Sequence, residues 1–295
     1  MRSTMFKKVI IPIDFSDDSQ YVVRCLSKIP QIREVVLLNI TKSLYLVRQP
    51  ETVNPDVDYA RLRLEELKKI IHMPRSKIRG LVEEISGGSI AEIINNVSIR
   101  EDVSLVMMGR RGRSVIESLL IGSTASELLK YGTKNLLLIH PPGTENDRGV
   151  LTVPCPDPFS KILICTDFSR PEIEQLCVAD MITNRSVVLF HVISTGDSND
   201  EVQENIKLAK ENLEKIKDKL IRHTKEIHTE VVIGDPAQEI LAYSEHEDVS
   251  MIVIKSTGEK NFIRNLLGTT AESVARTTQK PVLILRQRDS ESCQG

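Results

Sequence analysis

Four residues in the first half of the chain have the types and the spacing of an anion-binding loop. Gly109 and Gly112 are followed, after nine residues, by Gly122 and Ser123. An apolar run precedes them and a helix-like segment follows. Glycine lets the backbone approach a ligand closely, and N–H groups at a helix start, with a serine hydroxyl, can donate to phosphate oxygens. The pattern therefore predicts a strand, an anion-binding loop and a helix N-terminus.

A second copy of this pattern, altered at one position, lies about 146 residues later. Gly258 is followed after nine residues by Gly268 and Thr269, and Lys255 stands where the first copy has Gly109. A left-handed backbone would cost a lysine roughly 1 kcal/mol or more. The attraction between its positive charge and a phosphate would favour binding by about 1 to 4 kcal/mol, depending on the effective dielectric. The two effects are of similar size, so the sequence leaves the net effect of Lys255 open.

Other segments repeat in the same order, which predicts two tandem copies of one unit. We expect a first domain at residues 1–142, a linker at 143–158 that is rich in proline and glycine, and a second domain at 159–289. The matched segments are Lys8–Ser16 with Lys161–Ser169, Val35–Ile40 with Val187–Val192, Gly87–Ile94 with Gly234–Leu241, and Asn135–His140 with Pro281–Arg286.

Within each copy, short apolar runs alternate with helical patterns. Most of the runs are continuous rather than alternating, as in strands that are buried on both faces. The longest helical pattern spans residues 200–223, and its apolar stripe suits packing on a sheet. We therefore expect an α/β fold in which each copy is a five-stranded parallel open sheet with helices on both faces. The runs lie near residues 7–13, 34–40, 78–86, 103–108 and 135–140, and near 161–166, 187–193, 227–233, 250–254 and 281–286.

Composition narrows the class of protein. The 295 residues carry a net charge of −2, which argues against a general nucleic-acid binder. No apolar run is long enough to cross a membrane, and no signal peptide is visible. The five cysteines form no C-x-x-C pair. Together these features predict a soluble cytoplasmic protein with reduced cysteines.

Two carboxylates recur at the expected binding edge. Asp14 and Asp167 end the first strand of their copies, and the glycine loops follow the fourth strand. Ligands bind beyond the carboxyl ends of such strands, so both features should face one crevice per copy. We expect the carboxylates to hydrogen-bond a turn or a ribose rather than a metal. No histidine cluster predicts a metal site, and no catalytic triad can be assembled.

The G-x-x-G-x₉-G-[ST] spacing, the aspartate after the first strand and the strand–helix order resemble the universal stress protein family, in its tandem, ATP-binding branch. The resemblance covers the chain apart from its linker and tails. It implies an adenine nucleotide α-hydrolase-like, or Rossmann-like, fold that binds ATP or AMP, to which magnesium could be bound through the phosphates. It also implies little or no catalytic turnover and a role in stress tolerance or signalling.

The resemblance also implies a set of nucleotide-binding positions in each copy. Lys255 and Cys165 depart from the family pattern, where glycine and proline are usual. We therefore expect the first site to bind the nucleotide more tightly than the second. The three arginines around the first loop, at positions 110, 111 and 113, are expected to be mostly solvated. The implied positions are Pro12, Asp14, Ile40, Met108, Gly109, Gly112, Gly122, Ser123 and Thr124, and in the second copy Asp167, Val192, Ile254, Gly258, Gly268, Thr269 and Thr270.

The last apolar run of each copy, 135–140 and 281–286, would form a sheet edge, and a bare edge strand tends to pair with another. We expect the two copies to pair through these strands within the chain, with a homodimer of whole chains as a further option. Three alternative functions stay open, and one of them is a flavin-binding protein of a related fold, which a colourless purified protein would disfavour. A slow ATPase or nucleotide transferase would show turnover that Asp14→Asn abolishes, whereas a nucleotide-independent interaction module would bind no nucleotide.

Overall fold

The structure is a computed structural model that describes residues 6–29, 32–43, 54–73, 75–110, 121–141, 155–169, 182–194, 198–256 and 267–286. Contacts between Cα atoms divide the chain into two compact units. One consists mainly of residues 5–128 and 136–156, and the other mainly of residues 157–295. Each contains one copy of the repeated pattern.

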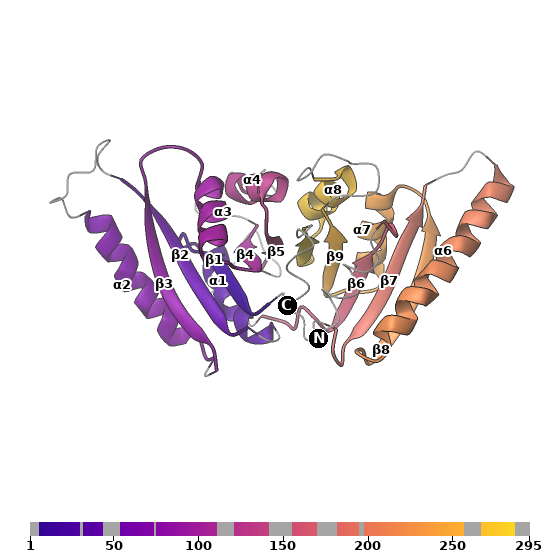
Figure 1. The fold of residues 1–295 in the computed structure, drawn as a ribbon, viewed down its shortest axis with the longest axis horizontal. Helices are drawn as coiled ribbons and strands as arrows, with labels where there is room; N and C mark the ends of the chain where they lie inside the picture. Colours follow the sequence, from indigo (N-terminus) through magenta and orange to yellow (C-terminus); the bar gives the residue numbers. More distant parts are fainter. Residues whose placement is uncertain are drawn as a thin grey trace. The chain divides into compact units, whose positions relative to one another are not determined.

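The first copy is built around parallel strands in the order β3-β2-β1-β4-β5 (Figure 1). Strand β1 pairs in parallel with both β2 and β4, and β2 pairs in parallel with β3. Because β1 lies between β2 and β4, the chain reverses its direction of winding at the carboxyl ends of β1 and β4. The elements are β1 (Lys8–Pro12), α1 (Asp17–Cys25), the 3₁₀ turn η1 (Leu26–Lys28), β2 (Glu34–Lys42), α2 (Pro55–Ile70), β3 (Lys77–Ile85), α3 (Ile90–Arg100), β4 (Leu105–Gly109), α4 (Ser123–Tyr131) and β5 (Asn135–Ile139).

The second copy repeats this topology. Its strand order is β10-β9-β6-β7-β8, and β6 lies between β7 and β9 as β1 lies between β2 and β4. The predicted α/β class and parallel sheets are therefore confirmed. The elements are β6 (Lys161–Cys165), β7 (Ser186–Ile193), α6 (Asn199–Leu220), β8 (Glu226–Ile233), α7 (Pro236–His246), β9 (Met251–Lys255), α8 (Thr269–Thr277) and β10 (Val282–Leu285).

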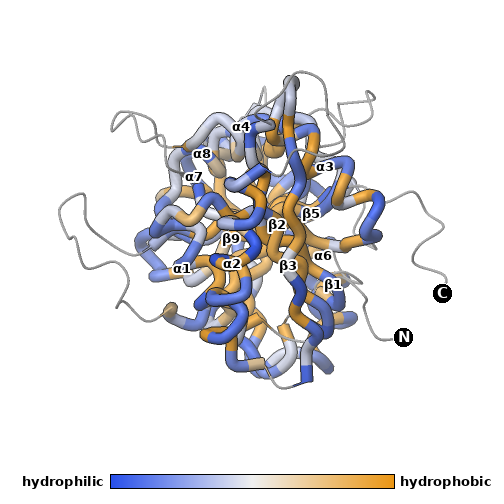
Figure 2. The backbone as a smooth tube through the Cα atoms, turned by 90° about the vertical axis from the view of Figure 1, so that its left-hand side faces the viewer, coloured by the Kyte–Doolittle hydropathy of each residue, from blue (hydrophilic) through white to orange (hydrophobic). Residues whose placement is uncertain are grey.

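The central strands form the core of each copy. All five residues of β4 and of β5 are buried, as are all four of β10. Figure 2 shows hydrophobic residues along β2 and hydrophilic residues on α2. Continuous burial explains why the apolar runs in the sequence lack a polar alternation.

Helix α6 packs through the apolar stripe that the sequence predicts. Ala209, Leu213, Ile216 and Leu220 are buried, and Ser198 caps the helix by accepting a hydrogen bond from the N–H of Glu201. None of the helices in the described part of the chain combines enough length with enough apolar character to cross a membrane.

A disulfide joins Cys25, at the end of α1, to Cys155, which precedes β6. The expectation that the cysteines are reduced is therefore wrong for this pair. The two residues are 130 positions apart, so no local sequence pattern could indicate the bond, but folding brings their Cα atoms to 5.3 Å. Cys165 in β6, by contrast, is buried and is not part of a disulfide.

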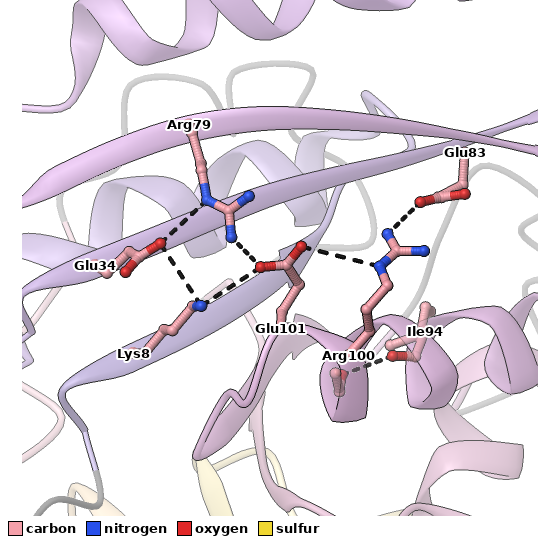
Figure 3. Close-up of polar contacts among 8 residues, drawn as sticks. Lys8, Glu34, Arg79, Glu83, Ile94, Arg100 and Glu101 are labelled. Carbon is pink, nitrogen blue, oxygen red and sulfur yellow. Dashed lines mark hydrogen bonds and ion pairs between the residues drawn. The ribbon is translucent and has the colours of Figure 1, made fainter.

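An ion network joins three strands of the first copy to the end of α3 (Figure 3). Glu101, just after α3, accepts from Arg79 of β3 and from Lys8 of β1, with a Lys8 Nζ–Oε2 distance of 3.4 Å. Glu34 of β2 accepts from Arg79 Nε at 3.1 Å. The hydrogen bond from Arg79 to Glu101 is the main reason why the pKa of the Glu101 carboxyl is below its usual value, and burial opposes this effect. The network fixes the amino ends of these strands, away from the candidate site.

Candidate functional site

A cavity of about 760 Å³ opens at the carboxyl ends of β6, β7 and β9 in the second copy. Helices α6, α7 and α8 complete its walls. This is the edge at which the sequence predicts a crevice, because parallel strands present their carboxyl ends together. The sequence-predicted positions that line it are Cys165, Asp167, Val192, Ile254, Lys255, Gly268, Thr269 and Thr270.

The turn after β6 fixes the cavity's carboxylate. Asp167 Oδ1 accepts hydrogen bonds from the backbone N–H of Ser169 at 3.1 Å and from its hydroxyl at 2.7 Å. Phe168, between them, has a left-handed backbone with φ 62°. Such a conformation is costly for a bulky residue and commonly marks a functional turn. The turn therefore holds the carboxylate in one orientation.

The first copy forms the same turn after β1. Asp14 Oδ1 accepts from the backbone N–H of Ser16 at 3.0 Å and from its hydroxyl at 2.5 Å, and Phe15 has φ 61°. The Ser16 hydroxyl also caps α1 by accepting from the N–H of Ser19. The helix expected after Ser169 lies outside the described residues. The repeated Asp-Phe-Ser triplet thus encodes one local structure in both copies.

Lys255 directs its side chain into the cavity, toward Asp167. Its Nζ lies 2.7 Å from Asp167 Oδ1 and also donates to the Ser169 hydroxyl. The lysine side chain is only 12% exposed. Lys255 has no positive φ, so the backbone cost considered from the sequence does not arise. The lysine can replace a glycine at this position because its ammonium group pairs with the Asp167 carboxylate.

The ion pair sets the protonation state of Asp167. Burial alone would raise the pKa of this carboxyl, but hydrogen bonds from Lys255 and Ser169 act in the opposite direction and prevail. The pKa of Asp167 is therefore below its ordinary value. At neutral pH the cavity contains a carboxylate beside an ammonium group, and their charges cancel.

One wall of the cavity is aromatic and apolar. The rings of Phe168 and His191 have centroids 4.4 Å apart, and Val192, Leu208 and Ile240 extend the wall. A flat heteroaromatic ring could pack against such a surface.

His191 is held in place by a hydrogen bond that both copies share. Its Nδ1 lies 2.8 Å from the carbonyl oxygen of Thr166, and in the first copy Asn39 Nδ2 donates to the carbonyl oxygen of Ile13 at 2.7 Å. Burial lowers the pKa of His191, and the hydrogen bond to Thr166 opposes this effect without cancelling it. His191 is thus neutral at pH 7, with Nδ1 carrying the proton that it donates.

The start of α8 forms another wall of the cavity. Gly268, which precedes this helix, was expected to donate its N–H group to an anion, but this group is bonded within the protein. The N–H of Gly268 donates to the carbonyl oxygen of Ser256 at 2.6 Å, and the N–H of Gly122 donates likewise to Arg110 at 2.7 Å. These bonds close the base of each glycine loop, so the glycine N–H groups are not the donors for an anion. The N–H groups of the first helical turn, beginning at Thr269, have no acceptor within the helix and are the backbone donors that an anion could meet here.

In the first copy, the predicted positions lie at the same edge. Pro12 ends β1, Ile40 lies in β2, and Met108 and Gly109 end β4 and are buried, whereas Ser123 and Thr124 begin α4. Gly112 and its counterpart Gly258 lie outside the described residues. So do the two arginines at positions 111 and 113.

Arg110 corrects one expectation. Its side chain is 2% exposed rather than solvated. Arg110 directly follows β4, whose five residues are all buried, so its backbone already lies inside the fold.

Sequence reasoning missed the part of the cavity that α6 and α7 supply. Asn205, Leu208 and Asn212 lie on one side of α6, and Asp235 precedes α7. Their spacing of three and four residues on α6 was a usable signal, but it adjoins the packing stripe and gives no hint of a ligand. Among the described residues, no three histidine, cysteine, aspartate or glutamate side chains are grouped to hold a metal ion.

Two tandem parallel α/β units, each with an aspartate turn and a helix N-terminus at its carboxyl edge, define a protein of the Rossmann-like class. The model of the Universal stress protein family matches residues 5–140 and 158–286. The chain belongs to this family.

Similar proteins include both tandem and shorter members. Universal stress protein Rv2623 from Mycobacterium tuberculosis is 22% identical over 295 residues, which cover 95% of this chain and 96% of the relative. Universal stress protein MJ0577 from Methanocaldococcus jannaschii is 27% identical over 158 residues and matches 45% of this chain and 98% of its own length. A universal stress protein structure from Archaeoglobus fulgidus superposes with a TM-score of 0.60 at 22% identity, covering 96% of this chain and 97% of that one.

Proposed function

We propose that this chain is an adenine-nucleotide-binding universal stress protein, which takes ATP or AMP at the carboxyl edge of each copy. The observation that supports it best is the cavity of the second copy. There, an apolar aromatic wall, a fixed carboxylate and a helix N-terminus surround one volume of about 760 Å³. That volume and that combination suit a base, a sugar and a phosphate in turn.

Each part of the nucleotide has a matching part of the cavity. The base packs near Val192 and the ring of His191, and the ribose lies beside Asp167. The phosphates meet the first turn of α8 at Thr269 and Thr270. In this arrangement the phosphates are bound by backbone N–H groups and hydroxyls, as at other helix N-termini.

The first copy takes the nucleotide in the same way and more tightly. Gly109 places no side chain beside Asp14, whereas in the second copy Lys255 takes up part of the carboxylate's hydrogen-bonding capacity. The remaining positions of the first site are Pro12, Ile40, Met108, Gly112, Gly122, Ser123 and Thr124.

The protein would act by occupancy rather than turnover, as a cytoplasmic sensor or signalling factor in stress tolerance. Its domains would span residues 1–142 and 159–289, with the linker at 143–158. We also propose that the two copies pair through β5 and β10, and that two chains can form a homodimer. Leu137→Pro, in β5, should separate or unfold the halves, and a compact, fully stable variant would contradict the pairing.

Calorimetric titration of the nucleotide-stripped protein with ATP and with AMP tests the proposal. We expect two sites per chain, a tight one that Gly122→Val removes and a weaker one that the matched variant Gly268→Val removes. Equal affinities in the two single-site variants would contradict the asymmetry. An absence of heat with either nucleotide, and no nucleotide released on denaturing the unstripped protein, would overturn the proposed function.

A further inference from the structure

His191 offers a fixed hydrogen-bond acceptor to the second cavity. Its Nδ1 lies 2.8 Å from the carbonyl oxygen of Thr166, and its ring packs on Phe168. A carbonyl oxygen can only accept, so the proton of the neutral ring is on Nδ1, and Nε2 carries a lone pair. Within the described part of the chain, Nε2 has no protein partner and is not one of the buried atoms that lack one. Since the ring lines the cavity, Nε2 is accessible to a ligand there.

The first copy leaves an acceptor over at the matched position, although the residue is different. Asn39 Nδ2 donates to the carbonyl oxygen of Ile13 at 2.7 Å, as His191 donates to Thr166. Asn39 is only 6% exposed, and among the described residues its Oδ1 is a buried atom without a partner. A buried acceptor without a donor is costly and rare in folded proteins. The two copies thus share a feature that a ligand with a hydrogen-bond donor would satisfy.

The surroundings of His191 indicate which kind of donor fits. The charged side chains that line the cavity are Asp167, Lys255 and Asp235. Lys255 Nζ lies 2.7 Å from Asp167 Oδ1, and Asp235 accepts from the N–H of Gln238 at 3.0 Å. The wall from α6 is uncharged, and the rings of Phe168 and His191 form a flat apolar surface beside it. A neutral amine attached to a planar ring suits this place better than a free cation. The residues of α6 that line the cavity are Asn205, Leu208, Ala209 and Asn212.

The nucleobases differ in this property. Adenine carries an amine on its six-membered ring, where guanine and hypoxanthine carry a carbonyl oxygen. An amine can donate to Nε2 of His191. A carbonyl oxygen in the same place would set one acceptor against another, with no proton between them, and both would lose their contact with water.

We propose that His191 selects the base in the second cavity, because its Nε2 accepts from the exocyclic amine of adenine and disfavours the 6-oxo bases. This selection deepens the proposed function and rests on it. It requires a neutral ring, since protonation puts a hydrogen on Nε2 and turns the acceptor into a donor. Burial lowers the pKa of His191, against the hydrogen bond to Thr166 and the charge of Asp167, so the selection is complete at neutral pH and is lost only in acid.

Calorimetric titration with AMP and with IMP, whose bases carry the amine and the oxygen respectively, tests this selection. Full-length protein with Gly122→Val restricts the measurement to the second cavity. At about pH 7.5 we expect AMP to bind about tenfold or more tightly than IMP. The ratio should fall toward one as the pH is lowered to about 5. Titration of the phosphate or of Asp167, Lys255 and Asp235 affects both nucleotides alike, so the ratio reports on the base.

Three variants separate a role in base selection from a role in packing. His191→Asn, which copies Asn39, should keep the preference for AMP and remove its pH dependence, because a carboxamide does not titrate. His191→Phe can still pack on Phe168 but has no acceptor, so the ratio should be close to one. His228→Asn is the matched control, because His228 lies outside the cavity with its side chain 60% exposed, and it should change neither the preference nor its pH dependence.

Nuclear magnetic resonance of the unaltered chain with ¹⁵N-labelled histidine gives a readout that needs no variant to bind. The Nε2 resonance of His191, assigned by its absence in His191→Asn, should shift when AMP binds. An unmoved Nε2 resonance in AMP-saturated protein, equal binding of AMP and IMP, or a preference that His191→Phe retains would overturn the base selection alone. An absence of binding by either nucleotide, with and without Gly122→Val, would overturn the proposed function as well.

Discussion

Single residues decide how the two copies differ at otherwise matched positions. The Asp-Phe-Ser turn, with its left-handed phenylalanine, is the same after β1 and β6. The closing hydrogen bond at the base of the glycine loop is also the same. The substitution of Gly109 by Lys255 changes the charge beside the carboxylate and leaves these features intact. At this position the two copies therefore differ in a side chain that faces the cavity of the second copy.

Glu101 offers a test of electrostatics at the residue level. Its pKa is lowered in the folded protein, so its contribution to stability is complete above the unfolded value of about 4.3 and is lost as the pH falls through the folded value. We expect Glu101→Gln to lower the free energy of unfolding by about 1 kcal/mol at pH 7, because Arg79 and Lys8 lose a charged acceptor. Urea denaturation from pH 7 down to about pH 2.5 measures this difference, which should be constant above about pH 5 and shrink as the pH falls through the lowered folded pKa.

The matched control is an exposed ion pair. Arg61 and Asp58 on α2 lie 3.1 Å apart, with side chains 67% and 55% exposed. Asp58→Asn should change stability by less than about 0.5 kcal/mol at any of these pH values. A loss for Glu101→Gln that is no larger, or one that grows as the pH falls, would show that the network in Figure 3 does not stabilise the fold.

At the scale of elements, α6 has two faces with separable roles. Leu213 is fully buried against the sheet, whereas Leu208 is 48% exposed and lines the cavity. We expect Leu213→Ala to destabilise the second copy by about 2–4 kcal/mol, since it leaves a void in a packed core. Leu208→Ala should cost less than about 0.5 kcal/mol but weaken nucleotide binding by the second cavity. Thermal unfolding and calorimetric titration measure the two effects.

The two leucines act as controls for each other, because the chemical change is the same. If Leu208→Ala lowered stability as much as Leu213→Ala, the helix would not have the two distinct faces described. If neither variant altered binding by the second cavity, α6 would not form one of the ligand-facing walls.

Elements were the most predictable level of this structure. The strands lie within about two residues of the apolar runs, because burial on both faces demands continuous apolar sequence. The carboxyl-edge location of the site followed from the parallel topology. The direction of the Lys255 side chain and the wall formed by α6 did not follow, because they depend on contacts between segments far apart in sequence. The buried Arg110 could not be distinguished from a solvated one by residue type alone.

At the scale of the whole chain, the disulfide between Cys25 and Cys155 is the longest-range covalent restraint in the described structure. It closes a loop that contains nearly all of the first copy, with 130 positions between its ends. Cross-linking a loop of more than about 100 residues restricts the unfolded chain and can stabilise the fold by up to about 4–5 kcal/mol. The first copy is therefore expected to depend on oxidation of this pair for part of its stability.

Thermal unfolding with and without a phosphine reductant tests this dependence, with Cys155→Ser as the variant. Cys155 is chosen because Cys25 is fully buried, and replacing it would also disturb the packing around α1. We expect the reductant to lower the melting temperature of the unaltered chain. Cys155→Ser should melt at that lower temperature whether or not reductant is present, and its mass should lack the two-dalton increase on reduction that one disulfide gives. Identical melting of the oxidised, reduced and variant proteins would mean that the bond joins two segments already held in place by packing, and that the first copy folds independently of its redox state.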